Sequence, residues 1–171
     1  MTIDQLRRQI QRRLTLASEA FHRFQAERGV YLGRRATKIH VAVYRLSGGR
    51  IGSRLPGRSL VRIVLVAHKG AKSGVDRTSP LMYVEDGTDL AVVASRAGHP
   101  KHPAWFHNLR ANPETTVQVG PTVRSVRARV ATDEERARLW PKFVAMFRGY
   151  DVYQRYSQGR KIPIVILEPR D

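Results

Sequence analysis

The chain has 171 residues, of which 42% are hydrophobic, and it contains no cysteine. This length is enough for one domain with a buried core, and the lack of cysteine excludes disulfides, thiolate metal sites and a cysteine nucleophile. The 31 Lys and Arg residues against 14 Asp and Glu give a net charge of +17, which predicts an anionic partner. No stretch approaches the roughly 20 apolar residues of a membrane span, and no secretion signal begins the chain, so a cytoplasmic location is expected.

Residues 1–36 are predicted to form a basic helical extension ahead of the main domain at 37–171. Apolar residues recur at spacings of three and four over residues 3–24, and Gly29 ends the pattern. The other face carries Arg7, Arg8, Arg12 and Arg23, so this helix suits the anionic inner surface of a cell membrane as a peripheral contact. Docking on the protein's own core, or on another subunit, is an equal alternative.

The remainder of the chain is typical of a small α+β domain. Residues 33–60 are rich in Gly and Arg and look like a connector with a short helix at 39–46. Strands are expected at 60–68, 80–85, 90–95, 115–119, 123–131 and 162–167. Asp86-Gly87 favours a tight hairpin, and helices are expected after Pro103 and from Asp133 to Met146, where Thr132 and Glu135 form a capping box. Few helices between short strands favour a mostly antiparallel barrel or sheet.

A glycine-rich basic loop follows the first long strand at residues 69–74. Its glycines allow a tight turn that points N–H groups at an anion, and Lys72, Ser73 and Arg77 supply further donors. The loop matches neither a P-loop nor a dinucleotide-binding fingerprint. A phosphate cradle and a plain solvent-exposed hairpin both fit it.

Residues 94–109 combine a strand end, a turn of small residues, several cations and the start of a helix. Loop amides and a helix N-terminus favour anions, and the indole of Trp105 can lie against a planar ring. Core packing is the alternative role for Trp105 and Phe106. No metal site is expected at the three histidines of this segment, because the helical His-x-x-x-His spacing is missing and cations surround them.

Aromatic residues recur every third position near the C-terminus, at Phe147, Tyr150, Tyr153 and Tyr156. This spacing follows one drifting helical face, where phenols can line an apolar cavity and donate hydrogen bonds. Ordinary packing of the C-terminal region accounts for them equally well.

Together these segments resemble the deazaflavin-dependent nitroreductase and quinone reductase family of actinobacteria over about residues 37–169. The resemblance rests on Gly-Ala-Lys-Ser-Gly at 70–74, Arg-Thr-Ser-Pro-Leu at 77–81, Pro-Lys-His-Pro-Ala-Trp-Phe-His-Asn-Leu at 100–109 and Ile-Pro-Ile-Val-Ile-Leu-Glu-Pro at 162–169. It implies a split β-barrel like that of FMN-binding oxidases, and coenzyme F420, a deazaflavin with a phosphodiester and an oligoglutamate tail. The implied reaction is hydride transfer from the reduced deazaflavin to a quinone, a nitro compound or another activated acceptor.

The resemblance also implies roles for individual residues. Lys72 and Arg77 are expected to hold phosphate or tail carboxylates. The cofactor-binding residues expected beside them are Ser79, Pro80, Ala94, Ser95, Arg96, Ala97, Gly98, Lys101, Trp105 and Asn108. Ser95, Tyr150 and Tyr153 are expected on the acceptor side as the catalytic residues. Phe147 stands where the nitroreductase pattern has tyrosine, which places nitroimidazole reduction in question, and Met82 replaces an aromatic residue of some members.

Two alternatives remain open at this stage. One is a related split barrel that binds FMN, since one phosphate and one aromatic plane satisfy the same loops. The other is a basic module that binds a membrane or nucleic acid without catalysis. Aromatic residues make up only 8% of the chain and cluster in expected core segments, which argues against nucleic acid. The sequence does not reveal the oligomeric state.

Overall fold

The computed structural model describes Gln5, Gln9 and residues 33–55 and 58–170. The amphipathic helix predicted over residues 3–24 falls almost entirely outside the described residues, so it stays a prediction, as does the division of the chain at residue 36.

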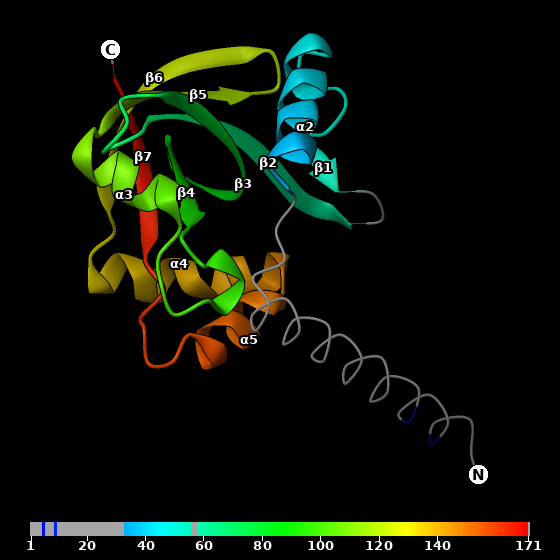
Figure 1. Cartoon of the computed structure of the whole chain (residues 1–171). Coiled ribbons are helices and arrows are strands. Elements are labelled where there is room, and N and C mark those ends of the chain that lie inside the picture. The colour runs from blue at the N-terminus through cyan, green and yellow to red at the C-terminus, as the bar shows by residue number, and fades with distance from the viewer. Residues whose placement is uncertain (1–4, 6–8, 10–32, 56–57, 171) are drawn as a thin grey trace.

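Six antiparallel strands close into a barrel (Figure 1). They are β2 (Arg58–Lys69), β3 (Asp76–Asp86), β4 (Asp89–Val93), β5 (Glu114–Val119), β6 (Thr122–Val130) and β7 (Ile164–Pro169). Their order is β2-β3-β4-β7-β6-β5, and a short pairing of β2 with β5, at Leu65↔Gln118 and Val66↔Val117, completes the circle. The two-residue β1 (Arg54–Leu55) pairs with β2. The predicted α+β barrel is therefore confirmed.

The local sequence explains these strands well. Residues alternate between the two faces of β2, so that Val64 and Val66 lie in the barrel interior while Ile63 and Leu65 face outward. The hairpin between β3 and β4 turns at Asp86-Gly87 as predicted, and Gly87 adopts a φ of 65°, a left-handed conformation that glycine tolerates best.

Helices cover the outside and one end of the barrel. They are α2 (Arg34–Leu46), the short 3-10 turn η1 (Arg96–Gly98), α3 (Ala104–Ala111), α4 (Asp133–Met146) and α5 (Gly149–Tyr156). The bounds of α4 match the prediction, and its capping box is present: the Thr132 hydroxyl accepts from the Glu135 amide at 3.2 Å, while the Glu135 carboxylate accepts from the Thr132 amide at 2.8 Å. In contrast, α2 starts at Arg34, earlier than the short helix predicted at 39–46.

Three apolar clusters hold these layers together. One fills the barrel interior, one joins α4 and α5 to the outer face of β4 and β7, and one joins α2 to the outer face of β2. Met82 packs against both outer clusters. The buried Tyr44 fixes α2 in place, because its hydroxyl donates to the Ile63 carbonyl at 3.0 Å and accepts from the Gly120 amide at 2.9 Å.

Candidate functional site

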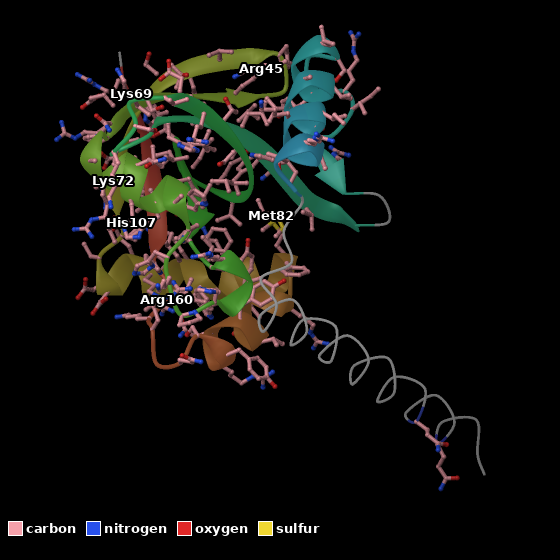
Figure 2. The ribbon with its side chains drawn as sticks, in the orientation of Figure 1. Arg45, Lys69, Lys72, Met82, His107 and Arg160 are labelled. Atoms are coloured by element: carbon pink, nitrogen blue, oxygen red, sulfur yellow. The ribbon has the colours of Figure 1, made fainter. Side chains whose placement is uncertain are left out.

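A cavity of about 1370 Å³ lies between α2, the β2–β3 end of the barrel and α3. Cationic side chains from three elements reach its walls, namely Lys38 and Arg45 from α2, Lys69 from β2 and Arg77 from β3. Figure 2 shows Lys69 and Lys72 together at the β2–β3 loop and Arg45 on α2. The remaining polar and aromatic walls include Thr37, Asp76, Thr78, Ser79, Trp105, Asn112, Glu114 and Thr115. The cavity therefore suits a ligand with both a flat apolar part and an anionic part.

The β2–β3 loop at 70–74 is a tight turn in which some backbone amides have no acceptor in the part of the chain that the structure describes. Gly70 and Gly74 use their amides within the turn, on the Val75 and Gly70 carbonyls at 2.9 and 2.8 Å. Within the described residues, the amides of Lys72 and Ser73 have no acceptor, and the Lys72 side chain is exposed. Two N–H groups without an acceptor beside a lysine suit an anion.

A chain of buried hydrogen bonds ties this loop to α3 and β3. The Ala71 amide donates to Asn108 Oδ1 at 3.0 Å, and Asn108 Nδ2 contacts His68 Nδ1 at 2.9 Å. His68 Nε2 contacts Ser79 Oγ at 3.0 Å. Because a backbone amide can only donate, Asn108 Oδ1 must be the acceptor, and its NH₂ group then donates to His68. The side chain of Asn108 thus holds the loop in position from behind.

The same chain determines the state of His68. Burial, followed by the nearby Arg77 guanidinium, lowers the pKa of His68 to about 4, so the imidazole is neutral near pH 7. With Nδ1 accepting from Asn108, the proton sits on Nε2 and is donated to the Ser79 oxygen. The Ser79 hydroxyl, which lines the cavity, is left with its own proton to donate to a ligand.

Trp105 packs in the core, which is one of its two expected roles, and it also reaches the cavity wall. It is only 8% exposed and belongs to the barrel core, where it meets Phe106 edge to face with ring centroids 6.4 Å apart. It also lines the cavity from the first turn of α3. The indole is thus held rigidly by core packing while one part of it remains available to a ligand.

A second loop, at residues 94–102, is held by one arginine that sequence reasoning missed. The Arg160 guanidinium donates to the carbonyls of Ala94, Ser95 and His99 at distances from 2.7 to 3.2 Å, and to His102 Nδ1 at 3.0 Å. Nothing in the local pattern Gly-Arg-Lys distinguishes it from a surface cation. These bonds fix the path of the loop that contains Ser95.

The backbone of this loop is strained. Arg96 and Ala97 both have a φ of 49°, which costs a residue with a Cβ about 1–3 kcal/mol. Gly98 follows with a φ of 80°, and a Cβ there would lie 2.8 Å from the Tyr153 carbonyl oxygen. The loop therefore packs tightly against α5, and only glycine fits at position 98.

His99 and His102 are hydrogen-bond partners whose environment favours the neutral imidazole. Burial and the Arg160 guanidinium lower the pKa of His102, and burial and the Arg96 guanidinium lower that of His99. His99 Nδ1 accepts from the Lys101 amide at 3.0 Å. No group of metal-ligating side chains large enough for a metal ion occurs in the part of the chain that the structure describes.

Of the C-terminal aromatic residues, Phe147, Tyr150 and Tyr153 belong to one buried cluster with Phe143, whereas Tyr156 is exposed. Tyr150 and Tyr153 are 3% and 7% exposed, and Tyr150 meets Phe143, Phe147 and Tyr153 edge to face. Burial raises the pKa of Tyr150 well above its usual range, so its phenol stays protonated and can only act as a hydrogen-bonding group near neutral pH. Neither tyrosine is among the residues that line the cavity.

The predicted site residues therefore fall into two groups. Arg77, Ser79 and Trp105 line the cavity, Lys72 lies on the adjoining loop, and Asn108 supports that loop from the interior. Pro80 is next on β3, opposite Leu65. The second group lies on the clamped loop and on α5; it comprises Ala94, Ser95, Arg96, Ala97, Gly98, Lys101, Tyr150 and Tyr153. His68 and Arg160, which the sequence did not single out, organise the first and second group respectively.

Comparison with known proteins gives consistent results. The family model described as F420H(2)-dependent quinone reductase matches residues 36–169. An F420H(2)-dependent quinone reductase of Mycobacterium tuberculosis is 37% identical over 144 residues, which cover 82% of this chain and 94% of that protein.

Solved structures agree with this. An F420-H2 dependent reductase, FDR-A, is 44% identical with a TM-score of 0.57, covering 62% of this chain and 93% of its own. A second structure, described as a domain-swapped dimer, is 37% identical with a TM-score of 0.60, covering 78% of this chain and 96% of its own.

Proposed function

The chain belongs to the F420H(2)-dependent quinone reductase family, and from that membership we propose that it is an oxidoreductase that uses coenzyme F420 to reduce a quinone. The observation that carries this proposal is the cavity in which the cations Lys69 and Arg77, the Ser79 hydroxyl and the rigid Trp105 indole meet, with the basic glycine loop 70–74 adjoining it. A flat ring with a polyanionic tail requires this combination of groups.

The residues present fit such a cofactor. The free amides of Lys72 and Ser73, with the charges of Lys72 and Arg77, would hold the phosphodiester. Lys38, Arg45 and Lys69 add positive charge along the cavity walls for the carboxylates of the tail. Trp105 would contact the flat part of the molecule.

When bound, reduced F420 supplies a hydride to the acceptor, and the protein's part is to bind, orient and exclude water. Ser95, Tyr150 and Tyr153 are proposed to lie on the acceptor side, where a hydroxyl would donate to the quinone oxygen. The loop of Ser95 is pre-set by Arg160, and it packs on α5 next to Tyr153. Phe147 offers no hydroxyl, so a quinone suits this side better than a nitroimidazole that needs an additional donor.

Contact with an anionic membrane through residues 3–24 belongs to the same proposal, since a quinone dissolved in lipid would reach the enzyme from that surface. In the described residues, no helix combines the length and the apolar character that a membrane span needs.

Cofactor titration tests the proposal directly. F420 is compared with its ribityl deazaflavin chromophore, which lacks the phosphate and the tail, and with FMN. Lys72→Ala and Arg77→Ala are each expected to weaken F420 binding about 10- to 100-fold, because each removes a charge-assisted contact of about 1.5–3 kcal/mol. Binding of the phosphate-free chromophore should change little.

Arg138→Ala is the matched control, because Arg138 is an exposed cation on α4 that pairs with Asp86, and neither residue lines the cavity. Unchanged F420 affinity in both Lys72→Ala and Arg77→Ala would reject the proposed phosphate-binding site. Tighter retention of FMN than of F420 would favour the flavoprotein alternative. Oxidation of reduced F420 by a menaquinone-like acceptor, followed by stopped flow, then tests the choice of acceptor against a nitroimidazole.

A further inference from the structure

The helix α2 has two apolar faces, of which the barrel covers one. Val41 and Tyr44 are buried against β2. Ile39, Val43 and Leu46 are spaced four and three residues apart, so they form a stripe on another side of the helix. Their exposed fractions are 65%, 37% and 90%.

This exposed stripe continues into the turn after the helix, where Ile51 is 62% exposed. Eight large hydrophobic residues are exposed in the part of the chain that the structure describes, and four of them lie between residues 39 and 51. A concentration of exposed apolar side chains on a soluble domain marks an interaction surface.

The charges around the stripe are all of one sign. Residues 33–55 contain six basic residues and no acidic one. Among the described side chains, Arg35, Lys38 and Arg50 are exposed and take part in no ion pair that the structure shows. Exposed leucine and isoleucine beside unneutralised cations is the composition of a helix that lies in the headgroup region of an anionic bilayer.

We propose that the outward face of α2 together with the turn through Ile51, here called the α2 face, is a docking surface for anionic phospholipid. A second copy of the chain suits this surface less well, because each copy has a net charge of +17 and the cations beside the two apolar stripes would repel one another. Nucleic acid suits it less well because the stripe is aliphatic and has no aromatic ring for bases to stack on.

The placement of α2 gives this surface a specific position relative to the cavity. Thr37, Lys38, Val41, Ala42 and Arg45 of the same helix line the cavity wall. A bilayer against the α2 face would therefore lie one helix away from the candidate site. Docking through α2 is also distinct from docking through residues 3–24, and it does not depend on which cofactor the cavity binds.

The test is sedimentation of the full-length protein, without cofactor, with vesicles of phosphatidylglycerol or of phosphatidylcholine. The native chain should bind phosphatidylglycerol, and binding should weaken when salt is raised to about 0.5 M. The double variant Ile39→Ser/Leu46→Ser should bind at least about tenfold more weakly, because two side chains lose their burial in the bilayer. Val130→Ser, at a 45% exposed position of β6, is the matched control and should bind like the native chain.

A second pair of variants tests the charges. Arg35→Gln/Arg50→Gln should weaken binding roughly tenfold or more at low salt. The charge-matched control Arg127→Gln/Arg170→Gln removes two cations that both pair with Glu114 and should weaken it much less. Since the stripe residues make no core contact, circular dichroism should show an unchanged fold in every variant.

Three results would overturn the assignment. Equal binding of the Ile39→Ser/Leu46→Ser variant and the native chain would show that the stripe does not enter the bilayer. Loss of binding only after Arg7→Gln/Arg8→Gln/Arg12→Gln would place docking on the N-terminal segment instead. A dimer that light scattering detects without vesicles, and that the stripe substitutions abolish, would make a second copy the occupant. None of these results depends on F420 titration, so they leave the proposed enzymatic function untouched.

Discussion

The β2–β3 loop and the loop at 94–102 are both irregular segments of the candidate site, yet they are held in place in opposite ways. The β2–β3 loop follows a strand and exposes Lys72. Its support comes from two neutral side chains, because Asn108 accepts from its Ala71 amide and His68 hydrogen-bonds to Asn108. The second is pinned by one cation, Arg160, and packs against the aromatic cluster of α5.

This difference indicates that the two loops have different roles. A neutral support leaves the charges of the β2–β3 loop free for an anionic ligand, since Asn108 and His68 do not compete for them. A cationic clamp saturates the carbonyls of the second loop and fixes a strained backbone that would otherwise relax. In the proposed site, the first loop keeps its cations available to a ligand, and the second loop is held in one conformation.

The largest effect is expected from removing the clamp. Arg160→Ala should lower the free energy of unfolding by roughly 3 kcal/mol or more, because several charge-assisted bonds are lost and backbone carbonyls are left unpaired. The free energy of unfolding of Arg160→Lys should lie between those of the native chain and Arg160→Ala, since an ammonium group cannot make all the hydrogen bonds of a planar guanidinium. Urea denaturation measures both, with Lys161→Ala as the neighbouring control, whose exposed ion pair with Asp133 should matter little. Equal stability of Arg160→Ala and Lys161→Ala would refute the clamp.

Breaking the neutral support should have the next largest effect. His68→Ala removes the hydrogen bonds that the imidazole makes with Asn108 Nδ2 and Ser79 Oγ, which should cost about 2 kcal/mol of stability. It should also weaken binding of F420 more than binding of the phosphate-free chromophore, because the loop and the Ser79 hydroxyl lose their orientation. His107→Ala, an exposed histidine on α3, is the control. A purely structural role for His68 would instead lower both affinities equally.

Acid should disrupt the same support through protonation. The pKa of His68 is about 4 in the fold and near 6.5 in an unfolded chain, so the unfolded state binds more protons between these values. Stability from this group is therefore complete above about pH 6.5, declines as pH falls toward 4 and is lost below it. The drop should be about 3 kcal/mol, since each unit of pKa difference corresponds to about 1.4 kcal/mol, and the difference between native and His68→Ala stability should shrink over this window. A constant difference would contradict the assignment.

The smallest change is expected at Tyr150. Its ring is packed among other aromatic rings, and phenylalanine keeps that packing, so Tyr150→Phe should leave F420 affinity and the fold unchanged. Turnover with a quinone should fall a few-fold if the hydroxyl donates to the acceptor. Because the pKa of Tyr150 is raised by burial, the pH profile of turnover should show no ionisation that disappears in the variant. The pH profiles of turnover of the native chain and of Tyr150→Phe are compared to test this expectation.

Several residues of the candidate site could be predicted from sequence, whereas two of its supports, His68 and Arg160, could not. Lys72, Arg77 and Trp105 lie in a run of glycines, cations and a helix start that has a direct physical meaning, and the strands follow from their β-branched residues. His68 looked like the end of a strand and Arg160 like a surface cation, because their partners are 40 and 58 to 66 residues away. Such long-range hydrogen bonds leave no local pattern.

The length of α2 was underestimated for a related reason. A helix is recognised by one apolar stripe that faces the core, but Ile39, Val43 and Leu46 face away from it. Together with the Gly and Arg around it, this second stripe obscured the periodicity of the buried positions.

The strand pairings that close the barrel differ in length. β2 and β3 pair over seven residues, but β2 and β5 pair over only two. Tyr44 spans this weak seam from α2, bonding the Ile63 carbonyl on one side and the Gly120 amide on the other. The helix α2 thus holds the two sides of the β2–β5 pairing together. Movement of α2 away from the barrel would break these hydrogen bonds and open the barrel first between β2 and β5, next to the cavity.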